Sequence, residues 1–292
     1  GIVEGKDAFT FYYEVELPAF TGTARLWLPS PQSDAYRKVT VEEGIWPLAP
    51  QKLQEAEHGN ELFYFELPEQ NKPQVIQLVY EVQRQEKKVY VADAPQPRDL
   101  QPDQKVPLGG KFALEARQAI GEKSSESPVV QARALYDFVI DNMRYMKYGA
   151  FGQGDANYAC DSKSGNCSEF HAYFIALARS VGIPARFAVG VAVPSDRDEG
   201  GIDGYHCWAE FYADGKWWPV DISEANKYTA LSTYYFGHHP ANRLEFSRGR
   251  DLLVQPLPVS GPINFLAFPV FEVEGKTLKP KTTFRFERKA GA

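Results

Sequence analysis

Residues 165–186, GNCSEFHAYFIALARSVGIPAR, place a cysteine at the start of a helical pattern. Apolar side chains recur there every three or four residues, which is the spacing of one buried helical face. They are Cys167, Phe170, Phe174, Leu177 and Val181. Gly182 can take the left-handed conformation that ends a helix, and Pro184 cannot continue it. Because a helix start offers unpaired N–H groups and positive potential, we expect Cys167 to have a lowered thiol pKa beside a partial oxyanion hole.

A second stretch, GYHCWAEFYADGKWWPVD, predicts a β-hairpin. Asp214-Gly215 is a strong signal for a two-residue turn, here between strands at 205–213 and 216–221. Paired positions across such a turn have numbers that sum to 429, so Trp208 lies opposite Asp221.

This register makes His206 and Asp221 diagonal neighbours on one face, about 7 Å apart at the backbone and within side-chain reach. An aspartate beside an imidazole fixes its tautomer and stabilises the cation that forms when histidine takes a thiol proton. Cys167, His206 and Asp221 are therefore the candidate nucleophile, base and orienting group of a cysteine-dependent acyl transfer.

These residues resemble the transglutaminase-like superfamily of papain-like cysteine enzymes, and more closely its bacterial members, over roughly residues 112–225. In that family the catalytic core contains small residues before the cysteine, a helix running into a GIPAR-like segment, an H-x-W-x-E strand and a W-x-x-x-D strand. The matching segments are Gly165-Asn166-Cys167, Gly182 to Arg186, His206 to Glu210, and Trp217 to Asp221. The resemblance implies an α+β fold, in which the nucleophile helix packs on an antiparallel sheet.

The resemblance also implies that Cys167 attacks the carbonyl of a carboxamide, in a peptide bond or a glutamine side chain, and forms a thioester. A peptide or protein is then the expected substrate. We expect water rather than an amine to resolve the thioester, because nothing in the sequence marks a second amine-binding surface. Two alternatives stay open: amine crosslinking by a protein-glutamine gamma-glutamyltransferase, and a noncatalytic peptide-binding module with a silent triad.

Family members often supply a second oxyanion donor from a Trp, Tyr or amide side chain upstream of the nucleophile. Gln153, Asn157 and Tyr158 are candidates, and we rank Tyr158 first. The tryptophans that flank the triad are expected to wall the substrate cleft. They are Trp208, Trp217 and Trp218.

Cys160, Cys167, His206 and Cys207 could alternatively form a zinc site. However, Cys160 and Cys167 are seven residues apart, and adjacent strand residues point to opposite faces. We therefore predict no metal and no cofactor, and expect Cys207 to pack in the core behind the site.

Two acidic features have simple interpretations. The loop 195–204, SDRDEGGIDG, does not have the spacing of an EF-hand, so we expect a solvated, mobile loop, with a lid over the cleft as the alternative. Glu210 shares the face of His206, where a salt bridge is its commoner use.

Composition places the chain among well-cored proteins of two domains, because 43% of its 292 residues are hydrophobic and 24% are charged. A net charge of −6 argues against a nucleic-acid partner. The chain has no apolar run of 18 residues, so we expect no transmembrane helix. It begins at Gly1 without a signal peptide, as a mature or trimmed form would, and the resemblance favours export. Three cysteines give no disulfide framework, and the oligomeric state is left open.

The chain is predicted to contain a small antiparallel β domain at 1–95, a proline-rich linker at 96–111 and the catalytic domain at 112–292. Strands of the first domain are expected at 9–17, 24–28, 37–41, 61–67 and 75–91. Helices are expected at 112–120 and 128–143, the second with Ser127 as N-cap, and late strands at 252–257, 263–273 and 282–286.

Overall fold

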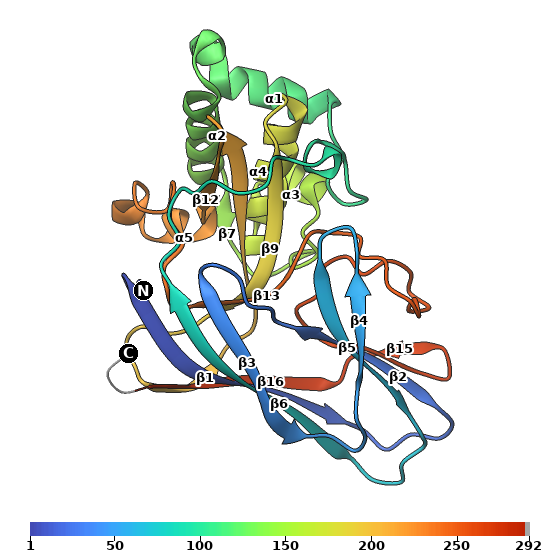
Figure 1. Cartoon of the computed structure of the whole chain (residues 1–292). Helices are drawn as coiled ribbons and strands as arrows, with labels where there is room; N and C mark the ends of the chain where they lie inside the picture. The colour runs from blue at the N-terminus through green and yellow to red at the C-terminus, as the bar shows by residue number, and fades with distance from the viewer. Residues whose placement is uncertain (290–292) are drawn as a thin grey trace. The chain divides into compact units, whose positions relative to one another are not determined.

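Strands from the two ends of the chain pair with each other in the computed structural model, which describes residues 1–289 except for the side chain of Glu43 (Figure 1). The chain forms two units, which we call the β unit and the helical unit. The β unit contains Gly1–Glu86, Val189–Tyr205 and Pro240–Ala292, and the helical unit contains Lys87–Ala188 and His206–His239. These bounds differ from the predicted division, because residues 240–292 join the β unit rather than the domain of the candidate nucleophile.

The first sheet of the β unit has the order β10-β16-β1-β6-β3. Its strands are β10 (Glu199–Ile202), β16 (Lys281–Arg288), β1 (Lys6–Leu17), β6 (Gln74–Gln85) and β3 (Arg37–Ile45). Buried residues alternate along β1, as expected of a strand with one face on a core. The segment predicted as a mobile acidic loop is partly a strand, since β10 is hydrogen bonded to β16.

The second sheet has the order β15-β14-β2-β5-β4. Its strands are β15 (Lys276–Leu278), β14 (Val270–Val273), β2 (Ala24–Ser30), β5 (Asn60–Leu67) and β4 (Gln51–Glu55). The Tyr80 hydroxyl on β6 donates to the Pro29 carbonyl on β2 at 3.3 Å, which joins the two sheets. Phe246 on β13 (Arg243–Arg248) packs against Phe11 and Phe284 of the first sheet.

The late strands were only partly predicted. The predicted strand at 282–286 lies within β16, but the one at 263–273 shortens to β14. The segment 252–257 forms only an isolated bridge between Leu252 and Ile263. Apolar residues cluster there because Leu252 and Val254 belong to a core with Trp27 of β2, so burial rather than strand pairing explains the pattern.

The helical unit is built around α4 (Cys167–Ser180), which packs against four helices and strand β11. Every residue from Cys167 to Arg179 is buried, so α4 is enclosed on all sides rather than on the single predicted face. The surrounding helices are α1 (Gly110–Ile120), α2 (Pro128–Asn142), α3 (Ala156–Ser162) and α5 (Ile222–Lys227). Three 3-10 turns complete the helical elements: η1 (Pro97–Leu100), η2 (Gly121–Ser125) and η3 (Thr229–Leu231). No helix among the described residues is both long and apolar enough to cross a bilayer.

A third sheet has the order β12-β11-β9-β13. Its first three strands are β12 (Lys216–Val220), β11 (His206–Ala213) and β9 (Ala185–Ala192). The last part of β9 belongs to the β unit, as does its partner β13. The predicted hairpin register is confirmed, because Ala209 pairs with Val220 and Ala213 with Lys216. Asp214 and Gly215 both have positive φ, as a two-residue turn of this kind requires. The predicted helices and the Ser127 N-cap are also confirmed. A short parallel pair, β7 (Arg144–Tyr145) and β8 (Ser164–Gly165), precedes α4.

The segment predicted as a linker is packed onto the helical unit. Arg179 of α4 donates to the carbonyl of Gln101 and to the carboxylate of Asp103, both at 2.9 Å. The backbone N–H of Ala156 donates to the carbonyl of Lys105 at 2.9 Å. Val106 is 1% exposed, so this stretch has core contacts that its proline content conceals.

Candidate active site

Cys167 is the first residue of α4, and the start of this helix is doubly capped. Asn166 accepts a hydrogen bond from the backbone N–H of Ser168 at 2.9 Å, while Glu169 accepts one from the backbone N–H of Asn166 at 3.1 Å. This is the reciprocal arrangement of a capping box. It fixes the helix start and leaves the thiol in the positive potential of the macrodipole.

Glu169 also orders the loop that precedes α3. Its carboxylate accepts hydrogen bonds from the backbone N–H groups of Gly152 at 2.8 Å and Gly154 at 2.7 Å, and it is fully buried. Sequence reasoning missed this residue, although an asparagine followed three positions later by a glutamate is a visible capping-box signal. One buried carboxylate therefore links the 152–154 loop to the helix start that carries Cys167.

The Cys167 sulfur lies against strand β11. The backbone N–H of Cys207 donates to Cys167 Sγ at 3.2 Å, so Cys207 is next to the thiol rather than only behind the site as expected. Burial alone raises the pKa of Cys167, but hydrogen bonds with Cys207 and His206 and the positive charge of the imidazolium outweigh it and lower the pKa to about 5. These interactions favour the thiolate form of Cys167.

His206 is the first residue of β11 and Asp221 directly follows β12, so the hairpin brings the two side chains together. His206 Nε2 lies 2.8 Å from Asp221 Oδ2, which leaves Nδ1 as the ring nitrogen available to the thiol. Asp221 is fully buried and is the N-cap of α5. Its second oxygen accepts hydrogen bonds from the Ser223 hydroxyl and the Glu224 N–H, both at 3.2 Å. The carboxylate is thus fixed on both oxygens.

His171 is a second buried histidine, which the sequence analysis missed. Its Nε2 accepts a hydrogen bond from the N–H of Ile222 at 3.0 Å, so the ring proton is on Nδ1, which donates to the carbonyl of Cys167 at 2.8 Å. Although Nε2 lies 4.0 Å from Asp221 Oδ1, the ring is neutral in this arrangement and the contact is not an ion pair. His171 therefore links the start of α4 to α5. Its position four residues after Cys167, on the same helical face, is the sequence signal that could have predicted this contact.

Glu210, on the same strand as His206, forms a buried ion cluster. Arg186 Nε lies 2.9 Å from its carboxylate, as does Lys87 Nζ, and the Tyr90 hydroxyl donates to it at 2.7 Å. Burial alone raises the pKa of Glu210, but the charges of Lys87 and Arg186 outweigh this and hold it well below its ordinary value. The expected salt bridge is therefore present, and it ties β11 to the arginine of the GIPAR segment.

The structure gives Tyr158 a different contact from the one expected of an oxyanion donor. Its hydroxyl hydrogen bonds to the carbonyl of Tyr148 at 3.5 Å. Tyr145 instead pairs with Gly165, two residues before the nucleophile. Burial and, next, the negative charge of the Cys167 thiolate raise the pKa of Tyr145.

Of the three predicted cleft tryptophans, Trp208 lies beside His206, with 6.1 Å between ring centroids. Trp217 is fully buried, and its indole N–H donates to the carbonyl of Asp93 at 2.9 Å. Trp218 stacks on Phe211 on the opposite face of the hairpin from His206. Trp208, although only 3% exposed, lies beside His206, whereas the indole of Trp217 is bound to Asp93 and Trp218 lies on the far face. The prediction is therefore corrected for Trp217 and Trp218.

The alternative zinc set is not assembled. The Cys160 thiol donates to Glu115 Oε1 at 2.8 Å, and burial raises its pKa to about 11. Within residues 1–289, side chains of His, Cys, Asp and Glu form no group of three or more arranged to hold a metal ion.

Comparisons of sequence find similar proteins for the part of the chain that carries this site. Residues 116–222 match the family described as the Transglutaminase-like superfamily. A curated Haemophilus influenzae relative, named only "Uncharacterized protein", is 30% identical over 186 residues, which are 52% of this chain and 50% of the relative. The chain thus spans about half the length of the curated relative it matches. The superfamily match supports cysteine-based catalysis at the level of the family.

Comparisons of structure bear on the fold. The chain is similar to the crystal structure of a "Putative Cysteine Protease" from Cytophaga hutchinsonii, with a TM-score of 0.64 and 14% identity over 98% of this chain and 99% of the other. The predicted α+β fold class, with a β part besides the transglutaminase-like core, is confirmed. The periplasmic domain of TgpA from Pseudomonas aeruginosa is also similar, with a TM-score of 0.39 and 14% identity over 79% of this chain and 91% of that domain.

Proposed function

We propose that this protein hydrolyses a carboxamide of a peptide or protein substrate, at a peptide bond or a glutamine side chain. Cys167 is the nucleophile, His206 the base and Asp221 the group that orients it. The single observation that supports this proposal most is the environment of the sulfur, where the Cys207 N–H and the His206 imidazole together lower the thiol pKa to about 5. A silent peptide-binding module has no need of such a thiolate.

In the first half of the proposed reaction, the Cys167 thiolate attacks the carbonyl carbon and a C–S bond forms. Negative charge moves to the carbonyl oxygen, where N–H groups at the start of α4 stabilise it. The His206 imidazolium then gives its proton to the leaving nitrogen as the C–N bond breaks. Asp221 stays hydrogen bonded to Nε2 of His206 throughout, so the proton that is transferred is the one on Nδ1 of His206.

In the second half, a water attacks the thioester carbon while His206 takes one of its protons. The C–S bond breaks, the carboxylic acid leaves and the thiolate–imidazolium pair returns. We propose Tyr145, in place of Tyr158, as the side-chain donor to the oxyanion. Its pairing with Gly165 and its charge interaction with Cys167 support this assignment.

A peptide library containing glutamine tests the reaction. Cleaved or deamidated peptides should appear with the intact chain and disappear with Cys167→Ser. A labelled primary amine at millimolar concentration should be incorporated slowly or not at all. Products that persist without Cys167, or amine incorporation faster than hydrolysis, would overturn the proposed nucleophile or the proposed acceptor, respectively.

A further inference from the structure

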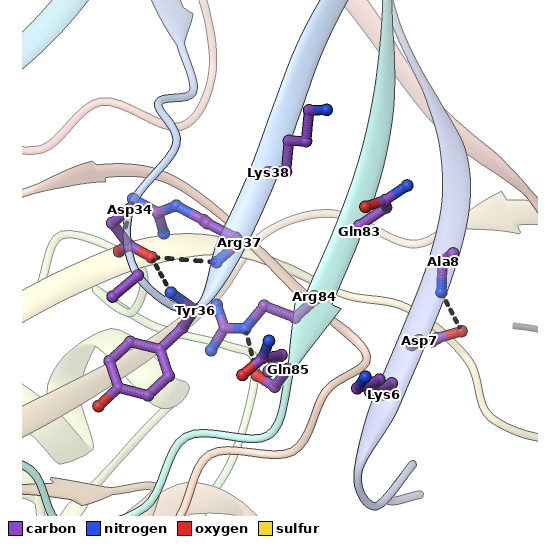
Figure 2. A pocket seen from close by; sticks show the side chains of 11 residues that line it. Lys6, Asp7, Ala8, Asp34, Tyr36, Arg37, Lys38, Gln83, Arg84 and Gln85 are labelled. Carbon is purple, nitrogen blue, oxygen red and sulfur yellow. Dashed lines mark hydrogen bonds and ion pairs between the residues drawn. The ribbon is translucent and has the colours of Figure 1, made fainter.

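The β unit contains a pocket of about 400 Å³ at the ends of three neighbouring strands, β1, β3 and β6 (Figure 2). Strand register brings charged side chains into one row there, because Asp7 on β1 and Arg37 on β3 both pair with Arg84 on the intervening β6. Lys6 and Lys38 also line the pocket. Its volume is in the range of small-molecule sites.

Arg84 is only partly satisfied by the protein. The residue is 4% exposed, and its Nε donates to the carbonyl of Gln85 at 3.1 Å. Its two Nη groups have no acceptor in the part of the chain that the structure describes. Figure 2 shows the guanidinium between Tyr36 and Gln85, which both line the pocket. These Nη atoms are not among the buried side-chain atoms that lack a partner, so their donors are open to the solvent of the pocket that Arg84 lines, where a bound anion can accept them.

The acidic residues of the pocket are bound to other groups. Both oxygens of Asp7 are held by Arg288, with N–O distances of 2.9 and 3.0 Å. One oxygen of Asp34 accepts the backbone N–H groups of Tyr36 and Arg37, at 2.8 and 3.1 Å. Neither carboxylate hydrogen bonds to Arg84, although Asp7 is its register partner on β1.

The charge of Arg84 persists at neutral pH. Burial and the neighbouring positive charge of Arg37 lower its pKa to about 10, which leaves the guanidinium protonated. The negative charges of Asp34 and Glu245 act in the opposite direction and offset part of this effect. The lining side chains carry an excess of positive charge, with four cationic residues against two acidic ones. The cationic residues are Lys6, Arg37, Lys38 and Arg84, and the acidic ones are Asp7 and Asp34.

We propose that this pocket binds a doubly negative phosphoryl group, anchored by the two Nη groups of Arg84. With Nε engaged by Gln85, the end of the guanidinium presents two parallel donors, which match two oxygens of one phosphate. Lys6 and Lys38 add point charges at the same pocket. Inorganic phosphate and a phosphate monoester share this chemistry, and the site is independent of the thiol chemistry proposed above.

Calorimetric titration of the full chain at constant ionic strength tests the site with three probes: inorganic phosphate, O-phosphoserine and succinate. Arg84→Met should weaken phosphate binding at least tenfold. Arg285→Met is the matched control, because it removes one arginine charge from β16 outside the pocket lining, and it should leave the affinity unchanged. Arg84→Lys, which keeps the charge and loses the paired donors, should bind phosphate more weakly than the intact chain.

Binding of O-phosphoserine as well as phosphate would identify a monoester as the source, and binding of phosphate alone would identify the free ion; both support the site. Absence of phosphate binding by the intact chain would overturn the proposal. So would equal affinities in the intact chain and Arg84→Met, or succinate binding as tight as phosphate. Should Arg84→Met fail to fold, unchanged affinity in Arg84→Lys would overturn it.

Discussion

The backbone N–H of Cys207 donates a hydrogen bond to the sulfur of Cys167 across 3.2 Å. Because this donor belongs to the residue after His206, one strand supplies both the proposed base and a group that stabilises the thiolate. The position of β11 against the start of α4 therefore controls the nucleophile. Changes that move either element should alter the thiol's pKa without touching the sulfur.

Replacement of Asp221 tests the orienting role. Asp221→Asn should leave the fold intact, since asparagine is also a good N-cap for α5, but lower turnover by about 10- to 10⁴-fold because the imidazole loses its fixed tautomer. Ser223→Ala is the control, as it removes one hydrogen bond to Asp221 and leaves the histidine contact. Steady-state kinetics on a substrate from the peptide library measures both. Full activity in Asp221→Asn would remove this residue from the mechanism.

Tyr145→Phe and Tyr158→Phe form a matched pair, since each removes one phenolic hydroxyl upstream of the nucleophile. If Tyr145 donates to the oxyanion, its variant should lose about 10²–10³-fold in kcat with little change in KM. Tyr158→Phe should lose far less, because that hydroxyl contacts the Tyr148 carbonyl. The reverse order of effects would restore Tyr158 as the donor.

The Glu210 cluster should make the stability of the fold depend on pH. The pKa of Glu210 is lower in the folded chain than its ordinary value of 4.5, so its ion pairs stabilise the fold above that pH and lose this effect as the pH falls below it. Glu210→Gln should lower the free energy of unfolding by about 3–5 kcal/mol at pH 7, because Lys87 and Arg186 lose a buried partner.

Urea unfolding at pH 7 and at pH 3.5 measures this difference, which should shrink at the lower pH. Glu122→Gln is the control, because Glu122 is exposed in η2. An equal loss for Glu210→Gln at both pH values would show that packing, rather than charge, carries the effect.

The segment at 96–109 should resist proteolysis, in contrast to the linker expected from its sequence. Arg179 holds it through Gln101 and Asp103. Brief trypsin digestion should spare Arg98 and Lys105 in the intact chain and cut there faster in Arg179→Met, as mass mapping of the fragments would detect. Rapid cleavage of the intact chain at these residues would mean that the segment is open in solution.

Local signals explain which parts of the fold the sequence could predict. Gly182 and the Asp214-Gly215 turn require special backbone conformations, so they marked the end of α4 and the register of the hairpin correctly. Pairing between β1 and β16 joins residues such as Phe9 and Arg288 that are far apart in the chain. No local pattern specifies such a partner, which is why the late strands were assigned to the domain at 112–292 rather than to the β unit.

The same distinction applies to the candidate site. Cys167, His206 and Asp221 stand in motifs with defined spacing, and the structure brings the last two within hydrogen-bond distance. His171 and Tyr145 act through tertiary contacts with α5 and with the segment before α4, and these contacts leave only weak traces in the sequence. The aromatic prediction failed for Trp217 and Trp218 because composition does not distinguish a cleft wall from a core.

The rate of Cys167 alkylation by iodoacetamide as a function of pH tests the central claim most directly. Because the thiol is 1% exposed, a small reagent is needed, and mass mapping assigns the rate to each cysteine. The rate at Cys167 should rise with a midpoint near pH 5, while Cys160 should stay unreactive until about pH 11. A midpoint near 9 at Cys167, or first labelling at Cys160 or Cys207, would contradict an activated nucleophile at the start of α4.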